Sequence, residues 1–265
     1  MTPPLLSDDL MKAAEQMRAR SEPFAYATIV RTAGATAAKP GAKALIGADG
    51  TILRGFLGGG CTRGAVRRAA LAALETGAPQ FVSIAPEELL EERGVAAGTE
   101  EDGVTYALNG CPSRGTVDIF IEPSLPMPEV LVLGASPVAE AIARLAPQFN
   151  WTVTREATVA RSAPRFRASV VATQGQGDLD ALTFALTDPA DHIAFVGSAR
   201  KFATLREKLI GIEPAIIDKV SAPAGLDIGA VTPEEIALTI MAELVQALRA
   251  ATPRGAQPKK LEATP

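Results

Sequence analysis

The chain contains only two cysteines, and both lie in glycine-rich stretches with an arginine nearby. Cys61 lies in "FLGGGCTRGAV" (56–66), and Cys111 lies in "NGCPSRGTV" (109–117). Each thiol follows a glycine and precedes an Arg-Gly pair by a few residues. Glycine lets the backbone approach a ligand closely, and a thiolate is both a nucleophile and a metal ligand. The matched spacing predicts one functional site in which Cys61 and Cys111 face each other across a ligand.

Three consecutive glycines precede Cys61. Gly58, Gly59 and Gly60 stand directly before a predicted helix, whereas a simple turn would need only one of them. Exposed backbone N–H groups in such a loop and at a helix start bind anions. The same helix start, with Arg63 close by, is expected to lower the pKa of the Cys61 thiol. These residues therefore predict contacts with an anionic cofactor.

Arginines near both thiols extend this interpretation. Arg63, Arg67 and Arg114 have the planar donors that pair with phosphate oxygens. The alternative stays open, because an isolated cysteine is often a small buried core residue and helical arginines are often solvated. Glycines, arginines and a reactive thiol together suit a phosphorylated, sulfur-bearing ligand such as a pterin dithiolene.

A second candidate site is the turn "GASPVA" (134–139), which falls between a predicted strand and a predicted helix. In a dinucleotide-binding Gly-x-Gly-x-x-Gly turn, Gly134 would be the first glycine, while Ser136 and Ala139 replace the second and third. The acid expected about 20 residues later is missing. We expect Gly134 and Ser136 to contact a nucleotide (NAD(P), FAD or an ADP-type ligand), and the alternative is a Rossmann-like fold with a degenerate site.

The elements that position these residues follow from hydrophobic periodicity and turn signals. For the first half we expect helices at 8–20, 62–76 and 86–94, strands at 24–31, 80–84 and 116–123, a hairpin turning at Asp49-Gly50, and a loop-rich stretch at 102–115. Gly77 is placed to end the second helix as its C-cap.

The second half alternates strands and helices, which is typical of a parallel doubly wound sheet. We expect strands at 129–133, 151–157, 168–173, 191–197 and 215–220, and a final helix at 232–250 with Thr232 as its cap and Glu235 three residues later. The proline-rich segment 122–129 is the expected linker. The predicted fold class is α/β, with an N-terminal mixed α/β domain (1–123), a Rossmann-like domain (124–250) and a disordered tail (251–265).

Composition narrows the function classes. The net charge of −4 gives no reason to expect a nucleic-acid partner, and no apolar run reaches the roughly 20 residues of a membrane span. The first 20 residues lack the features of a secretory signal, and two cysteines make no disulfide framework, so we expect a cytoplasmic protein. The single histidine, His192, is expected to be structural. Any metal would bind to Cys61, Cys111 or carboxylates.

Two further stretches carry a family resemblance, "FVGSARKFATLREKL" (195–209) and "APAGLDIGAVTPEEIALTIMAELV" (222–245). Together with the two cysteine motifs, they resemble the xanthine dehydrogenase accessory protein family (the XdhC/CoxI group), including its carbon monoxide dehydrogenase (CoxF-like) branch. The resemblance extends from about residue 24 to about residue 248. The sequence departs from the family pattern after Cys111, where Pro112 stands in place of a glycine, and at the nucleotide turn.

The resemblance implies a maturation factor for molybdenum hydroxylases. Such a protein would act as a carrier rather than an enzyme, binding molybdopterin or molybdopterin cytosine dinucleotide and supporting its sulfuration. Its partners would be an apo molybdenum hydroxylase of the xanthine or CO dehydrogenase type and a sulfur donor such as a cysteine desulfurase, and it would form a homodimer. Asp227 is the candidate polar residue of an interdomain cleft. Two other interpretations are an NAD(P)- or FAD-dependent oxidoreductase and a thiol redox or copper(I)-binding protein, since two thiolates suit copper(I).

Overall fold

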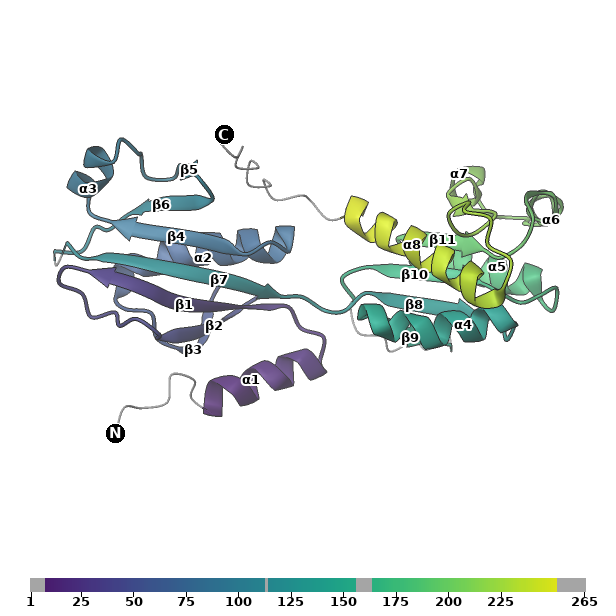
Figure 1. The fold of residues 1–265 in the computed structure, drawn as a ribbon, viewed down its shortest axis with the longest axis horizontal. Coiled ribbons are helices and arrows are strands. Elements are labelled where there is room, and N and C mark those ends of the chain that lie inside the picture. The colour runs from purple at the N-terminus through teal and green to yellow at the C-terminus, as the bar shows by residue number, and fades with distance from the viewer. Residues whose placement is uncertain (1–7, 113, 156–163, 252–265) are drawn as a thin grey trace, which may run out of the picture. The chain divides into compact units, whose positions relative to one another are not determined.

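The computed structural model describes residues 8–112, 114–155 and 164–251 and divides the chain into two compact units (Figure 1). The N-terminal unit lies within residues 1–126, and the C-terminal unit is Met127–Ala251. Each unit has two hydrophobic clusters of its own. No helix among the described residues combines the length and the apolar character needed to cross a bilayer.

The N-terminal unit is built on a mixed sheet, whose described strands have the order β3-β2-β1-β7-β4-β6-β5. Strands β4 and β6 pair in parallel, and the other neighbours are antiparallel. In chain order its elements are α1 (Asp8–Ala19), β1 (Phe24–Ala33), β2 (Lys43–Gly47), β3 (Ile52–Gly55), α2 (Gly60–Thr76), β4 (Gln80–Ala85), α3 (Glu87–Glu92), β5 (Glu100–Glu101), β6 (Val104–Leu108) and β7 (Thr116–Ser124).

Strand β1 shows how the two faces of this sheet are used. Successive side chains of a strand point to opposite faces. Ala25, Ala27 and Ile29 belong to the cluster that packs under α2, whereas Phe24 packs with α1 in the other cluster. Helices α1 and α2 therefore cover opposite faces. Gly77 ends α2 in the left-handed conformation (φ 68°), which confirms the predicted C-cap.

The predicted hairpin is confirmed. Strands β2 and β3 pair antiparallel around the Asp49-Gly50 turn, where Gly50 has φ 78°. The Asp49 carboxylate accepts hydrogen bonds from the amide (3.0 Å) and the hydroxyl (2.7 Å) of Thr51. These bonds hold the pKa of Asp49 below its usual value and fix the turn.

The C-terminal unit contains a parallel sheet with helices on both faces. Its described strands have the order β12-β11-β10-β8-β9 and all pair in parallel. Its elements are β8 (Glu129–Leu133), α4 (Pro137–Leu145), a 3-10 turn (Ala146–Phe149), β9 (Thr152–Thr154), β10 (Arg167–Val171), α5 (Asp178–Thr187), β11 (His192–Phe195), α6 (Ala199–Arg206), α7 (Pro214–Ile217), β12 (Val220–Ser221) and α8 (Pro233–Ala251).

One cluster packs α4 and α8 on this parallel sheet, and the other packs α5, α6 and α7. Figure 1 shows α4 and α8 lying alongside β8. The prediction of a mixed α/β unit followed by a Rossmann-like parallel-sheet unit is confirmed.

Helix α8 begins with the predicted capping residues. The amide of Glu235 donates to the Thr232 hydroxyl (3.3 Å), and the Glu235 carboxylate accepts from the amides of Thr232 (2.9 Å) and Val231 (2.8 Å). This reciprocal arrangement is a capping box. The bonds from both amides hold the pKa of Glu235 below its usual value.

Two element predictions are wrong, and two fall partly on residues that the structure does not describe. Residues 102–115 were expected to be loop-rich, but they contain strand β6, which pairs with β4. The apolar run 215–220 was expected to be a strand, but it begins inside helix α7, which Pro214 starts. The expected strand 151–157 is observed as β9, and residues 156–163 lie outside the described part. The predicted tail also lies there, apart from Ala251, which ends α8.

Candidate functional site

The triple-glycine loop leads into an open helix start. Helix α2 begins at Gly60 with Gly59 as N-cap, and no side chain caps it. A Cβ atom at Gly59 or Gly60 would meet nothing within 4 Å, and the first turn carries no acidic residue. Thr62 closes the turn, because its amide (3.3 Å) and hydroxyl (3.0 Å) both donate to the Gly59 carbonyl. This backbone carries the partial positive charge that attracts anions. Cys61 lies in this first turn, and its side chain is outside the described part.

The second cysteine loop is held by a buried amide side chain. Asn109 is buried, its Nδ2 donates to the Gly115 carbonyl, and its Oδ1 accepts from the Cys111 amide at 3.0 Å. The Arg114 amide donates to the Cys111 carbonyl at 3.0 Å. The Cys111 side chain is partly exposed. Asn109 therefore anchors the backbone at Cys111 and at Gly115.

A segment that no sequence motif marked, residues 34–38, contacts both loops. Ala35 pairs with Arg114 in a parallel β-bridge, and a Cβ at Gly115 would lie 2.5 Å from the Ala35 carbonyl oxygen. At the other end of the segment, the Cβ of Ala38 lies 3.5 Å from the position of a Cβ at Gly58. The segment thus joins the two cysteine loops.

The sheet topology agrees with this connection. Strands β4 and β6 are parallel, so the loop after β6, which contains Cys111, lies at the edge where β4 ends. Helix α2 precedes β4, packs on the sheet and joins β4 through residues 77–79. Because this connection is short, α2 runs antiparallel to β4 and begins at the same edge (Figure 1). How the two thiols face each other stays a prediction.

Arg114, a predicted phosphate contact, has a side-chain partner. Its guanidinium forms an ion pair with Glu88 at 2.7 Å, and both side chains are well exposed. An exposed pair of this kind contributes about 0–1 kcal/mol. A ligand phosphate could therefore replace Glu88 as the partner of Arg114 at little cost.

A cavity of about 490 Å³ lies beside the triple-glycine loop. Phe56, Gly58, Arg63 and Arg67 are among its lining residues. Arg63 and Arg67 are one helical turn apart and share a face of α2. In the described part of the chain, no ion pair involves either arginine. The cavity therefore offers positive charge next to the open start of α2.

The turn after β8 is shaped by Gly134. This residue has φ 113°, and a Cβ there would lie 2.5 Å from the Ala172 carbonyl oxygen at the end of β10. The strand order reverses between β8 and β10. The loops that follow two such strands are the usual ligand position in doubly wound folds. The buried Ser136 hydroxyl caps α4 by accepting from the Ala139 amide at 3.1 Å. The predicted nucleotide contact of Ser136 is thus, in this structure, a helix cap.

Two ion pairs lie near this turn. Arg155 forms an ion pair with Glu140 in the first turn of α4 at 2.6 Å. After β10, the buried carboxylate of Asp178 pairs with Lys201 at 2.7 Å and accepts a hydrogen bond from the Thr173 hydroxyl. Burial opposes ionisation of Asp178, but the bonds from Lys201 and Thr173 outweigh it and hold its pKa below the usual value. Sequence reasoning missed this cluster, whose only signal is an acid after two glycines at a strand–helix junction.

The remaining candidates lie elsewhere in the C-terminal unit. Asp227 is exposed on the loop between β12 and α8, and its role in a cleft stays a prediction. His192 binds the buried Glu243 at 2.8 Å, which tethers β11 to α8. Among the described residues, no group of three or more His, Cys, Asp or Glu side chains could hold a metal ion.

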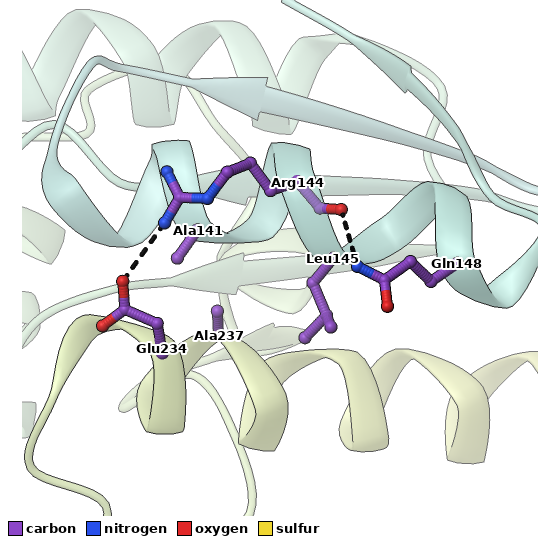
Figure 2. A pocket seen from close by; sticks show the side chains of 6 residues that line it. All are labelled: Ala141, Arg144, Leu145, Gln148, Glu234 and Ala237. Atoms are coloured by element: carbon purple, nitrogen blue, oxygen red, sulfur yellow. Dashed lines mark hydrogen bonds and ion pairs between the residues drawn. The ribbon is translucent and has the colours of Figure 1, made fainter.

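A smaller cavity, of about 190 Å³, lies between α4 and α8 (Figure 2). Arg144 and Glu234 form an ion pair across it at 3.1 Å, and Gln148 donates to the Arg144 carbonyl. Its volume is below the range of about 300–1,000 Å³ that is typical of ligand sites. The cavity beside the triple-glycine loop is the better candidate.

Comparisons with known proteins give the family of the chain. Residues 17–85 match the model of the XdhC and CoxI family, and residues 130–244 match the model of the XdhC Rossmann domain. The uncharacterized protein YqeB of Escherichia coli is 29% identical over 90% of this chain, which spans 46% of that protein's length. A crystal structure described as a xanthine dehydrogenase from Bacillus halodurans aligns with a TM-score of 0.43 at 17% identity, over 93% of this chain and 97% of that one. The two family models together cover more than half of the chain, which belongs to the XdhC and CoxI family.

Proposed function

We propose that this protein is a maturation factor that binds a molybdopterin-type cofactor in its N-terminal unit and supports the sulfuration of that cofactor and its insertion into a molybdenum hydroxylase. Membership of the XdhC and CoxI family supports the accessory role. The observation that carries the binding site is the 34–38 segment, which joins the loops of Cys61 and Cys111 at one edge of the sheet. A carrier of a sulfur-bearing cofactor needs thiol chemistry and phosphate binding side by side.

The residues at this edge fit such a cofactor. The uncapped start of α2 and Arg63 provide donors for a phosphate, and Arg114 can exchange Glu88 for a second anionic oxygen. The Asn109 side chain anchors the Cys111 amide, and in this proposal Cys111 contributes its thiol to the same site. When bound, the cofactor supplies the dithiolene that holds molybdenum. The protein's own residues bind its phosphate, orient it and present two thiols.

The proposed partners follow from the same function. An apo molybdenum hydroxylase of the xanthine or CO dehydrogenase type would receive the cofactor, and a sulfur donor such as a cysteine desulfurase would deliver sulfur to it. A homodimer is part of the proposal. Size-exclusion chromatography with light scattering, with and without the apoenzyme, measures both assemblies.

Cofactor retention tests the central claim. Purified full-length protein is incubated with molybdopterin and passed through a desalting column, and the retained pterin is measured by fluorescence after oxidation. We expect retention by the wild type and by Arg68→Gln, an exposed control on α2 that does not line the cavity. Cys61→Ser and Cys111→Ser should each reduce retention several-fold. A wild type that retains no pterin, and that Cys61→Ser matches, would contradict the proposal.

A second candidate function rests on Gly134, which lies at the strand-order reversal of the parallel sheet. In this second candidate, the protein is a nicotinamide- or flavin-dependent oxidoreductase that binds NAD(P) or FAD at the turn after β8. Calorimetric titration with NAD, NADP, FAD and ADP tests this candidate. Tight binding of a dinucleotide together with no retention of molybdopterin would favour it.

A third candidate follows from the two cysteine loops at one edge, since two thiolates suit copper(I) or a reversible disulfide. Thiol counting with and without reductant, together with elemental analysis of the purified protein, separates this candidate from the first. Two reduced thiols and no bound copper would exclude it.

A further inference from the structure

We propose that the cavity beside the triple-glycine loop binds a phosphorylated planar heterocycle, with Phe56 stacking on the ring and Arg63 and Arg67 binding the phosphate. This inference rests on the proposed function only for the identity of the natural ligand, because a pterin phosphate and a cytidine phosphate share this chemistry. It adds Phe56 to the site and assigns Arg67, already a candidate phosphate contact, to this cavity.

The aromatic side chain is placed for stacking. Phe56 directly follows β3, its amide donates to the Lys43 carbonyl at 3.3 Å, and its side chain is 58% exposed while lining the cavity. One exposed apolar residue is common on protein surfaces. Here the exposed ring shares a cavity with two arginines. An aromatic side chain can stack on the flat face of any nucleic-acid base.

The arginines are placed for the phosphate. A Cβ at Gly50 would lie 2.5 Å from the Cγ of Arg67, so the stem of Arg67 packs on the turn glycine. The Nε of Arg67 donates to the Asp49 carbonyl at 3.2 Å. These two contacts fix the side chain and leave its terminal nitrogens for a ligand. Arg63 lies one turn nearer to the start of α2, whose partial positive charge favours the same anion.

One acid, Asp49, interacts with Arg67 through its charge. Its carboxylate accepts from both the amide and the hydroxyl of Thr51, which keeps its pKa low and the group ionised. Asp49 therefore offsets part of the charge of Arg67 and leaves Arg63 as the stronger phosphate contact. The cavity volume of about 490 Å³ lies within the range that small-molecule sites occupy. Positive charge, an exposed ring and sufficient volume therefore coincide in one cavity.

Nucleotide titrations of the full-length protein test the subsite. The probes are GMP, whose guanine has the amino-oxo ring edge of a pterin, CMP, the nucleosides guanosine and cytidine, and inorganic phosphate, each titrated by isothermal calorimetry. We expect GMP or CMP to bind at least about tenfold more tightly than its own nucleoside and than phosphate, because ring and phosphate contacts add. Tighter binding of GMP would indicate that the cavity takes the pterin end of the cofactor, and tighter binding of CMP would indicate that it takes the cytidine end.

Variants separate the two contacts. Phe56→Leu should weaken the preferred nucleotide and its nucleoside alike, by about tenfold, whereas Phe56→Tyr should keep both affinities. Arg63→Gln and Arg67→Gln should each weaken the nucleotide about tenfold and leave the nucleoside unchanged. Arg68→Gln, on the same helix but outside the cavity lining, should bind like the wild type.

Three outcomes would overturn the subsite: neither nucleotide binds, Phe56→Leu binds as the wild type does, or Arg68→Gln weakens binding as much as Arg67→Gln does. These outcomes are distinct from a failure of the proposed function. Retention of molybdopterin without nucleotide binding would reject only the subsite. Nucleotide binding that the Phe56 and arginine variants abolish, without retention of molybdopterin, would reject only the maturation role.

Discussion

Two glycines on either side of Cys111 differ sharply in the space around them. A Cβ at Gly115 would lie 2.5 Å from the Ala35 carbonyl oxygen, whereas a Cβ at Gly110 would meet nothing within 4 Å. We expect Gly115→Ala to lower the free energy of unfolding of the N-terminal unit by about 1–3 kcal/mol, because the 34–38 segment must move away. Urea denaturation followed by far-UV circular dichroism measures the change.

Gly110→Ala is the matched control in the same loop and should change the free energy of unfolding by less than about 0.5 kcal/mol. Equal stability of the two variants would show that the contact between Gly115 and the 34–38 segment is absent in solution. Because that segment joins the cysteine loops, Gly115→Ala should also reduce molybdopterin retention, while Gly110→Ala should not.

Glu243 makes the stability of the C-terminal unit depend on pH. Burial opposes ionisation of its carboxyl, but hydrogen bonds from His192, Ser221 and the Gly225 amide outweigh burial and hold its pKa below the usual 4.5. A carboxyl with a depressed pKa stabilises the fold above its unfolded pKa. This stabilisation is therefore complete above about pH 5.5 and is lost as the pH falls through 4.5 toward the folded pKa.

Glu243→Gln should flatten this dependence. Between pH 6 and pH 4 we expect the free energy of unfolding of the wild type to fall more steeply than that of the variant, because glutamine takes up no proton. Glu207→Gln, at an exposed position after α6, is the control and should keep the slope of the wild type. Parallel slopes for all three proteins would contradict the role of Glu243.

At the scale of the element, Ser136 has two candidate roles, as the cap of helix α4 and as a nucleotide contact. Stability measurements can separate them. Its hydroxyl caps α4 by accepting from the Ala139 amide. We expect Ser136→Ala to cost about 1 kcal/mol without any ligand present, and Ser136→Asp to restore most of that loss, because aspartate is an equally good cap. Thermal unfolding followed by fluorescence measures both. An unchanged Ser136→Ala variant would leave nucleotide binding as the remaining role of Ser136.

Elements with strong local signals could be predicted from the sequence. Helix α2 has a glycine C-cap, the β2–β3 hairpin has its Asp-Gly turn, and α8 has a capping box, and each of these signals acts within a few residues. Strand β6 was missed because it is short and lies between Gly103 and Gly110, which favour a loop. It is stabilised by pairing with β4, which is distant in the sequence. The run 215–220 was assigned wrongly because short apolar runs do not distinguish strand from helix.

The candidate site was predictable only in part for the same reason. Both cysteine loops and Arg63 were visible in the sequence because the chain has only two cysteines and each follows a glycine and precedes an Arg-Gly pair. The 34–38 segment and Phe56 carry no such pattern, since their roles come from contacts with residues distant in the sequence. Asp178 likewise gains its partner Lys201 only when α5 and α6 pack on the sheet.

At the scale of the whole molecule, the two units contain separate cores, and one residue allows them to be followed separately. Trp151 is the only tryptophan of the chain, is 3% exposed, and packs edge to face on Phe166 in the C-terminal unit. Its fluorescence therefore reports the unfolding of that unit. Far-UV circular dichroism reports the helices and strands of both units.

We expect urea denaturation to show different effects of substitutions in the two units. Gly115→Ala should shift the circular dichroism transition and leave the urea midpoint of the Trp151 fluorescence transition unchanged, since each unit has a hydrophobic core of its own. Ser136→Ala should shift the fluorescence transition. If Gly115→Ala shifted both transitions equally, the units would unfold as one cooperative block, and the cofactor edge of the N-terminal unit would then be coupled energetically to the parallel sheet that follows it.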